Sequence, residues 1–146
     1  MARSFEYKHP TTYAEIVEAE TRAHARRRAE LAKAEKMIRA IESDLKALCD
    51  QRVPYAVSSY SMCLVDVRDD ISGRAQYAVR IAGGIFFETR DLLPRALVAL
   101  GWIAERVKLS KYDSTVVFRR PKTQVRVQVD ASVELGTALT KSEACT

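Results

Sequence analysis

Apolar residues recur at helical spacing in the first third of the chain and alternate with other residues after Pro54. The stretch from Thr12 to Asp50 has no Gly or Pro and is rich in residues of high helix propensity. Thr12 followed by Glu15 matches the capping box, in which each side chain accepts a hydrogen bond from the other residue's backbone N–H. We therefore predict one helix over residues 12–50, about 58 Å long if straight, after an irregular segment over residues 1–11.

An apolar stripe with the three- and four-residue spacing of a coiled-coil seam marks the second part of this helix. It consists of Leu31, Ala34, Ile38, Ile41, Leu45 and Leu48. Because so long a helix overhangs a domain with a radius of gyration of about 12 Å, it needs a partner. Packing within the chain and packing on a foreign protein are alternatives, but we expect the helix to pair with a second copy, in a dimer or larger assembly.

Two predicted hairpins follow, separated by a second helix. In the first, alternation places Val57, Cys63, Val65 and Val67 on one face, and residues 76–82 form the partner strand after a turn at Gly73. The second hairpin pairs residues 112–120 with residues 123–130 around Pro121-Lys122. Between them, Ile85-Phe86-Phe87 is either a short buried strand or a lead into the second helix.

The second helix is predicted from Thr89 or Asp91 to about Lys108. Its apolar face consists of Leu93, Leu97, Leu100, Ala104 and Val107. Pro94 is tolerable in the first turn. Gly101, in the middle, costs about 1 kcal/mol relative to Ala, and we attribute it to close packing of helix on sheet.

These elements predict an α+β fold in the order α-β-β-(β)-α-β-β. A long N-terminal helix precedes an antiparallel sheet of four or five strands with one packed core helix. The compact domain covers residues 54–130, and residues 131–146 form a weakly docked tail.

Composition favours a soluble cytoplasmic protein. The chain has 146 residues, of which 47% are hydrophobic and 29% charged, which suits one globular domain with a helical appendage. Its N-terminus lacks the apolar region of a secretory signal, and no apolar run is long enough to span a membrane. The three cysteines form no C-x-x-C motif, as expected of free thiols in a reducing compartment.

Positive charge is concentrated in two blocks, although the net charge is only +5. Residues 22–39 hold seven basic and two acidic residues, and residues 106–126 hold seven basic residues and one acidic residue. From these blocks we predict contacts with a partner or with phosphates at Arg22, Arg26, Arg27, Arg28, Arg119, Arg120, Lys122 and Arg126. A solvated helix face and a charged edge strand that resists aggregation are the alternatives.

The motifs of the common enzyme and metal sites are missing. His9 and His24 have neither metal-ligand spacing nor a nearby cysteine. With only these two poorly placed histidines, a Cys-His or Ser-His nucleophile–base pair would be an accident. Gly83-Gly84 lacks the flanking pattern of a phosphate-binding loop. We therefore predict no catalytic residues, no metal and no cofactor.

The leading hypothesis is a non-catalytic binding protein that docks through basic surfaces onto an acidic or nucleoprotein partner. A phage-type inhibitor that occludes a nucleic-acid-handling complex is one form of such a protein. The alternatives are direct, sequence-nonspecific nucleic-acid binding and a structural homo-oligomer or assembly subunit. A small-ligand pocket between subunits is a fourth hypothesis, because such a pocket leaves no local motif.

Overall fold

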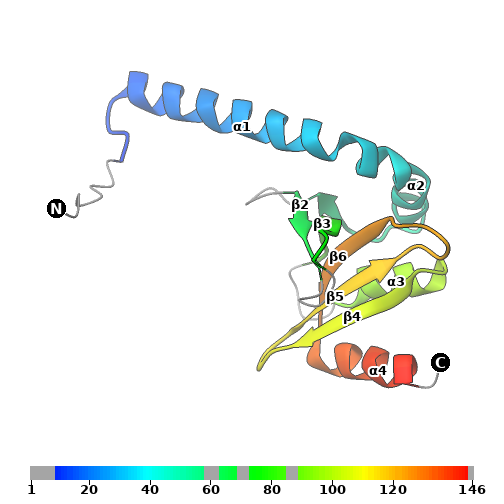
Figure 1. Cartoon of the computed structure of the whole chain (residues 1–146). Helices are drawn as coiled ribbons and strands as arrows, with labels where there is room; N and C mark the ends of the chain where they lie inside the picture. Colours follow the sequence, from blue (N-terminus) through cyan, green and yellow to red (C-terminus); the bar gives the residue numbers. More distant parts are fainter. Residues whose placement is uncertain (1–8, 58–62, 69–72, 85–88, 145–146) are drawn as a thin grey trace.

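The chain folds into an α+β domain from which one long helix projects (Figure 1). The computed structural model describes residues 9–57, 63–68, 73–84 and 89–144. The helices are α1 (Tyr13–Ala40), α2 (Glu42–Asp50), α3 (Leu92–Ala99) and α4 (Val133–Ala144). The strands are β1 (Ala56–Val57), β2 (Leu64–Asp66), β3 (Tyr77–Ala82), β4 (Ile103–Leu109), β5 (Ser114–Arg119) and β6 (Arg126–Ala131). The predicted fold class is confirmed.

The start of the first helix resembles the predicted capping box, with one change of partner. The Thr12 hydroxyl accepts a hydrogen bond from the Glu15 N–H at 3.1 Å. The Glu15 carboxylate accepts from the N–H of Thr11, at 3.4 Å, rather than from that of Thr12. The side chain of Thr12 thus satisfies one of the free N–H groups of the first turn.

The predicted helix over residues 12–50 is wrong in its continuity, because it breaks at Ile41. Ile41 leaves helical geometry at φ −108° and ψ 6°, and α2 begins at the next residue. Its side chain is 1% exposed, and that of Leu48 is fully buried. The break turns α2 down along the sheet (Figure 1), so that the apolar stripe continues over the core instead of passing above it.

The six strands form a mixed sheet, which corrects the predicted antiparallel one. The strand order is β1-β3-β6-β5-β4, and β2 also pairs with β3. β3 runs parallel to β6, whereas the other pairs are antiparallel. The β5–β6 hairpin was predicted, and its pairing runs from Ser114–Ala131 to Arg119–Arg126.

The predicted grouping of Val57 with Val65 and Val67 on one face is wrong. Both β1 and β2 pair with β3, but Val57 lies opposite Ile81 and Leu64 lies opposite Val79. This register puts Val57 and Leu64 on the main core, while Val65 and Val67 lie on the other side of the sheet. The intervening residues 58–62 of the predicted strand, and the predicted short strand at residues 85–87, lie outside the described residues.

The predicted second helix ends earlier than expected, and its second part is strand β4. α3 stops at Ala99, and Gly101 adopts φ +96°. The Gly101 N–H donates to Val98 O and the Trp102 N–H donates to Leu97 O, each at 3.0 Å, which is the Schellman arrangement. A Cβ on Gly101 would meet nothing within 4 Å. The reason for this glycine is therefore its backbone angle, not close packing.

The predicted tail is also wrong, because residues 133–144 form helix α4. Ser132 caps this helix by accepting the Leu135 N–H at 3.1 Å, and the Asp91 carboxylate holds Ser132 through its N–H at 2.8 Å. A Cβ on Gly136 would lie 2.3 Å from the Ser114 hydroxyl oxygen, so α4 packs closely on β5. Leu135 and Leu139 join the main core.

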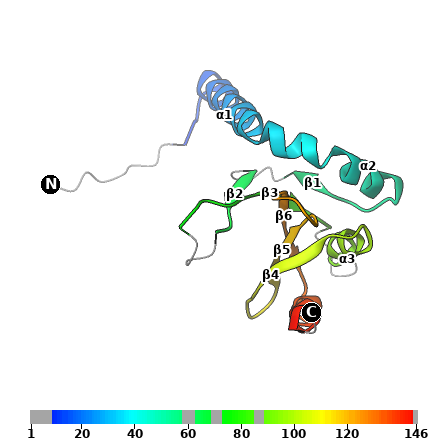
Figure 2. The ribbon, with the colours of Figure 1, turned by 45° about the vertical axis from the view of Figure 1, so that its right-hand side comes forward.

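Helices α2, α3 and α4 all pack against one face of the sheet. This core includes Leu48, Leu97, Phe118, Val127 and Val129, together with other buried residues. The second face, which we call the open face, carries Ala78, Arg80, Val117, Arg126 and Gln128, and Figure 2 shows no described helix across it. Helix α1 passes along the β1–β2 end of the sheet and extends beyond it.

Candidate binding surface

Four basic residues of α1 lie on one side of the helix. At 100° per residue, Arg22, Arg26, Lys33 and Lys36 fall within about 80° of arc, and all four are exposed. We call this set the basic stripe. It extends about 21 Å along the helix axis, the rise of about six nucleotides in one strand of duplex DNA.

The charge of the basic stripe is only weakly compensated. Arg22 forms an ion pair with Glu18, and Lys33 lies 3.9 Å from Glu30. The Arg22–Glu18 pair is exposed, so water screens the attraction between its charges. Two acidic residues thus stand beside the four basic ones. In the part of the chain that the structure describes, Arg26 and Lys36 make no ion pair. The stripe therefore presents net positive charge to solvent.

The basic stripe ends at a cavity between α1 and the first residues of β3 and β6. This helix cavity has a volume of about 550 Å³. The charged residues in its lining are Lys36, Arg74 and Arg126, and the lining contains no acidic residue. Gln76, Gln124 and Tyr77 add two amides and one aromatic ring. Cations gathered at one cavity repel each other, and an anionic ligand would relieve that repulsion.

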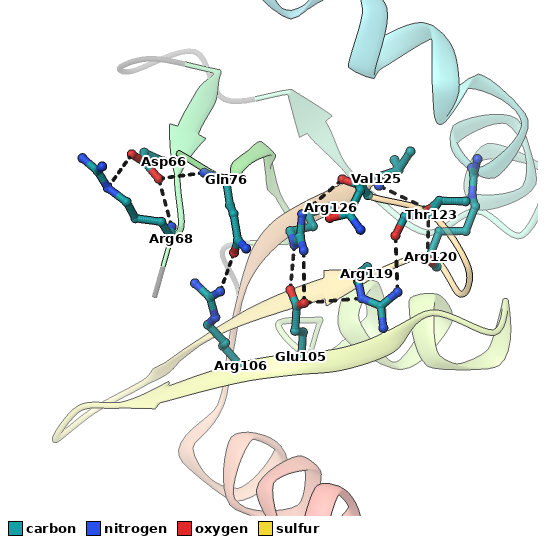
Figure 3. A network of polar contacts seen from close by, with 11 residues as sticks. Asp66, Arg68, Gln76, Glu105, Arg106, Arg119, Arg120, Thr123, Val125 and Arg126 are labelled. Atoms are coloured by element: carbon teal, nitrogen blue, oxygen red, sulfur yellow. Dashed lines mark hydrogen bonds and ion pairs between the residues drawn. The ribbon is translucent and has the colours of Figure 1, made fainter. Parts of the chain in front are cut away.

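Arg126 joins the helix cavity to an ion-pair network on the open face. The Arg126 Nε and Nη2 atoms donate to the two Glu105 carboxylate oxygens at 2.7 and 3.2 Å. Arg119 lies 3.4 Å from the same carboxylate, so one acid is shared by two guanidinium groups (Figure 3). The cluster therefore keeps one net positive charge.

Glu105 reaches both arginines because it is the extra residue of a β-bulge. Ala104 pairs with Phe118 and Arg106 with Val117, which leaves Glu105 without a partner residue on β5. Burial alone would raise its pKa, but the hydrogen bond from Arg126 and the charges of Arg126, Arg106 and Arg119 outweigh burial and lower the pKa below 4.5. Glu105 thus remains ionised at neutral pH.

The open face holds a second, wider cavity of about 800 Å³, bounded by β4, β5 and the segment after β2. Its charged lining has both signs, with Asp66 and Glu105 beside Arg68, Arg106 and Lys108. The Asp66 carboxylate accepts hydrogen bonds from the backbone N–H of Arg68 at 2.9 Å and of Gln76 at 3.2 Å, and these bonds lower the pKa of Asp66. Because its lining holds two acidic residues beside three basic ones, this cavity is a weaker candidate for an anion than the helix cavity.

The four predicted sites on α1 separate in the structure. Arg22 and Arg26 belong to the basic stripe, whereas Arg28 is exposed on another side of the helix. Arg27 points toward the domain, and its Nη2 donates to Val57 O at 3.1 Å. Its Nη1 is buried and has no hydrogen-bond partner among the described residues. Consecutive arginines therefore do not act as one surface.

The four predicted sites of the second hairpin are mostly engaged within the chain. Arg119 and Arg126 share Glu105. Arg120 pairs with Asp44 of α2, and its guanidinium lies 5.3 Å from the Trp102 ring centre. Lys122, exposed at the turn with φ +63°, makes no ion pair within the described residues. Three of the four cations are therefore engaged in ion pairs within the chain, and Lys122 is the member left to meet a partner.

The predicted oligomer seam lies largely in the chain's own core. Ala34, Ile41 and Leu48 are 0 to 1% exposed, and Ile38 and Leu45 pack against the main core. Leu31, at 36% exposed, is the member that faces solvent. The alternative of packing within the chain therefore applies to this stripe, and a second copy would need another surface.

Sequence reasoning counted Lys33 and Lys36 in the basic block but did not select them as site residues. Their spacing from Arg22 and Arg26 is the helical signal that identifies them. Arg74, Gln76, Tyr77 and Gln124 were not selected either, because the helix cavity joins segments that are far apart in the sequence.

Comparison with protein-family models, curated proteins and solved structures finds no match to this chain. Among the described residues, no group of three or more His, Cys, Asp and Glu side chains is placed to hold a metal ion. No described helix combines the length and the apolar character needed to cross a membrane.

Proposed function

We propose that this chain is a non-catalytic binding protein that docks onto a polyanionic partner through the basic stripe and the helix cavity. The partner is a nucleic acid, a nucleoprotein or an acidic protein surface. The observation that carries the proposal is the continuity of the two features: Lys36 belongs to both, and the charged residues lining the cavity are all basic. The free thiols of Cys49 and Cys63 suit a reducing compartment such as the cytoplasm.

The projection of α1 supports this proposal. Almost all of its residues from Tyr13 to Arg26 are exposed, so the first part of the helix gains little from burial against its own domain. An isolated helix as short as the segment from Tyr13 to Arg26 is only marginally stable in water. A partner that covers the basic stripe would add the contacts that the domain does not supply.

A second candidate, homo-oligomer assembly, is favoured by the apolar residues at the start of α1. Tyr13 is 84% exposed, Ile16 46% and Val17 45%. Spaced by three and four residues, Tyr13, Ile16 and Val17 lie close together on the helix surface. A second copy that packed on this patch would bury side chains that the domain leaves in water.

One experiment distinguishes the two candidates: the mass in solution by light scattering, alone and with a 20-base-pair DNA duplex or polyglutamate. The proposal predicts a heavier complex with at least one polyanion at 50 mM salt that dissociates by 500 mM salt, because released counterions drive such binding. A stable oligomer that binds neither these polyanions nor a single-stranded nucleic acid would support assembly and contradict the proposal.

A further inference from the structure

We propose that the helix cavity is a base-binding subsite for single-stranded nucleic acid, with the basic stripe following the adjoining phosphates. This inference rests on the proposed function and narrows the partner to one chemical class. Tyr77 lines the cavity and remains 47% exposed. Exposed tyrosines on which successive bases stack are a common device of proteins that bind single strands.

The two amides of the cavity complement the edge of a base. The Gln76 side-chain oxygen accepts a hydrogen bond from Arg106 Nη2 at 2.5 Å, which holds the amide and leaves its NH₂ group as a donor. Gln124 is exposed, and its side chain makes no hydrogen bond within the described chain. Amides of this kind can donate to and accept from the edges of an unpaired base.

The cations at the cavity can receive the phosphates next to that base. Lys36 from α1 and Arg74 from the segment before β3 line the same cavity as Tyr77. Arg126 is held by Glu105 and is 5% exposed, so it forms part of the wall, whereas Lys36 and Arg74 are exposed. Lys33, Arg26 and Arg22 continue the positive charge away from the cavity along α1.

The combination of ring, amides and cations favours nucleic acid over an acidic protein. A carboxylate-rich peptide would satisfy the cations, and its backbone could hydrogen-bond the amides, but it offers no flat ring to stack on Tyr77. A duplex keeps its bases stacked and paired inside the helix, so it offers phosphates but no free base face. A single strand supplies both, and a volume of about 550 Å³ is within the range of small-ligand pockets, about 300–1,000 Å³.

The test measures binding of labelled dT15 and U15 by fluorescence anisotropy, beside a 15-base-pair duplex and polyglutamate. We expect Tyr77→Leu, which keeps apolar bulk but removes the ring, to weaken single-strand binding about tenfold and leave duplex binding unchanged. Tyr77→Phe retains the ring and should bind like the unmodified protein. Tyr112→Leu is the matched control, because Tyr112 is 76% exposed and lies outside the helix cavity.

The outcomes separate this inference from the proposed function. Equal binding of dT15 by the Tyr77→Leu and unmodified proteins overturns the base subsite and leaves polyanion docking in place. Binding of polyglutamate without binding of any nucleic acid also overturns the base subsite and leaves polyanion docking in place. Binding of none of the four probes overturns both. A thermal melt of each variant verifies that the fold is retained.

Discussion

At the scale of single residues, Glu105 shows how a charge can be structural within a basic region. Its carboxylate separates Arg119 from Arg126 on the open face and makes two hydrogen bonds to Arg126. Without it, two guanidinium groups would face each other in a partly buried site. The bulge that aims Glu105 at them follows from the register of β4 on β5, so the sequence alone gave no sign of this contact.

We expect Glu105→Gln to destabilise the protein by about 1–3 kcal/mol at pH 7, because it removes one partner of a partly buried charge pair. The folded-state pKa of Glu105 lies below 4.5. Its contribution to stability is therefore complete above about pH 4.5 and is lost as the pH falls through the lower, folded pKa. Urea unfolding of the variant and of the unmodified protein measures the loss of stability at pH 7 and its change at pH 3.

The difference between the variant and the unmodified protein should shrink at pH 3. Glu35→Gln is a suitable control, since Glu35 pairs with Arg39 at 61 and 70% side-chain exposure and should cost less than about 1 kcal/mol. An equal difference at both pH values would show that the carboxylate charge of Glu105 is not what stabilises the site.

At the scale of elements, helix endings are where the sequence-based prediction failed. Leu93, Leu97, Leu100, Ala104 and Val107 fit a helical period, yet the last two lie on β4. Gly101 was the signal that could have ended α3, because a glycine with φ > 0 commonly follows a helix. Ile41 offers no comparable signal: its break depends on the core beneath it. Capping at Thr12 and the β5–β6 hairpin were predictable because both are local.

Gly101→Ala should lower the free energy of unfolding by about 1–2 kcal/mol, measured by urea denaturation. The cost comes from the backbone, since φ is +96° and no atom lies within 4 Å of the added Cβ. Gly101→Asn should cost less, because asparagine tolerates positive φ better than alanine does. A neutral Gly101→Ala would contradict the account of how α3 ends.

At the scale of the whole molecule, the sequence predicted the α+β class and the excess of basic residues but not their grouping. Arg26, Arg27 and Arg28 are adjacent in sequence, yet the structure turns them to different sides of α1. From the sequence, Arg119, Arg120 and Arg126 have no evident partner. In the folded chain, Glu105 and Asp44 form ion pairs with them. Long-range pairing decides which charges remain for a partner, and a local pattern cannot supply it.

The measurement that tests the central claim most directly is the salt dependence of polyanion binding by two triple variants of equal charge. Arg26→Ala, Lys33→Ala and Lys36→Ala remove most of the basic stripe. Arg28→Ala, Arg39→Ala and Lys46→Ala remove the same charge from exposed residues outside it. We expect the first variant to lose at least tenfold in affinity and to flatten the slope of log K against log salt by about 2–3. The second variant should bind with an affinity and a salt slope close to those of the unmodified protein. Equal losses of affinity in the two variants would contradict docking through the basic stripe.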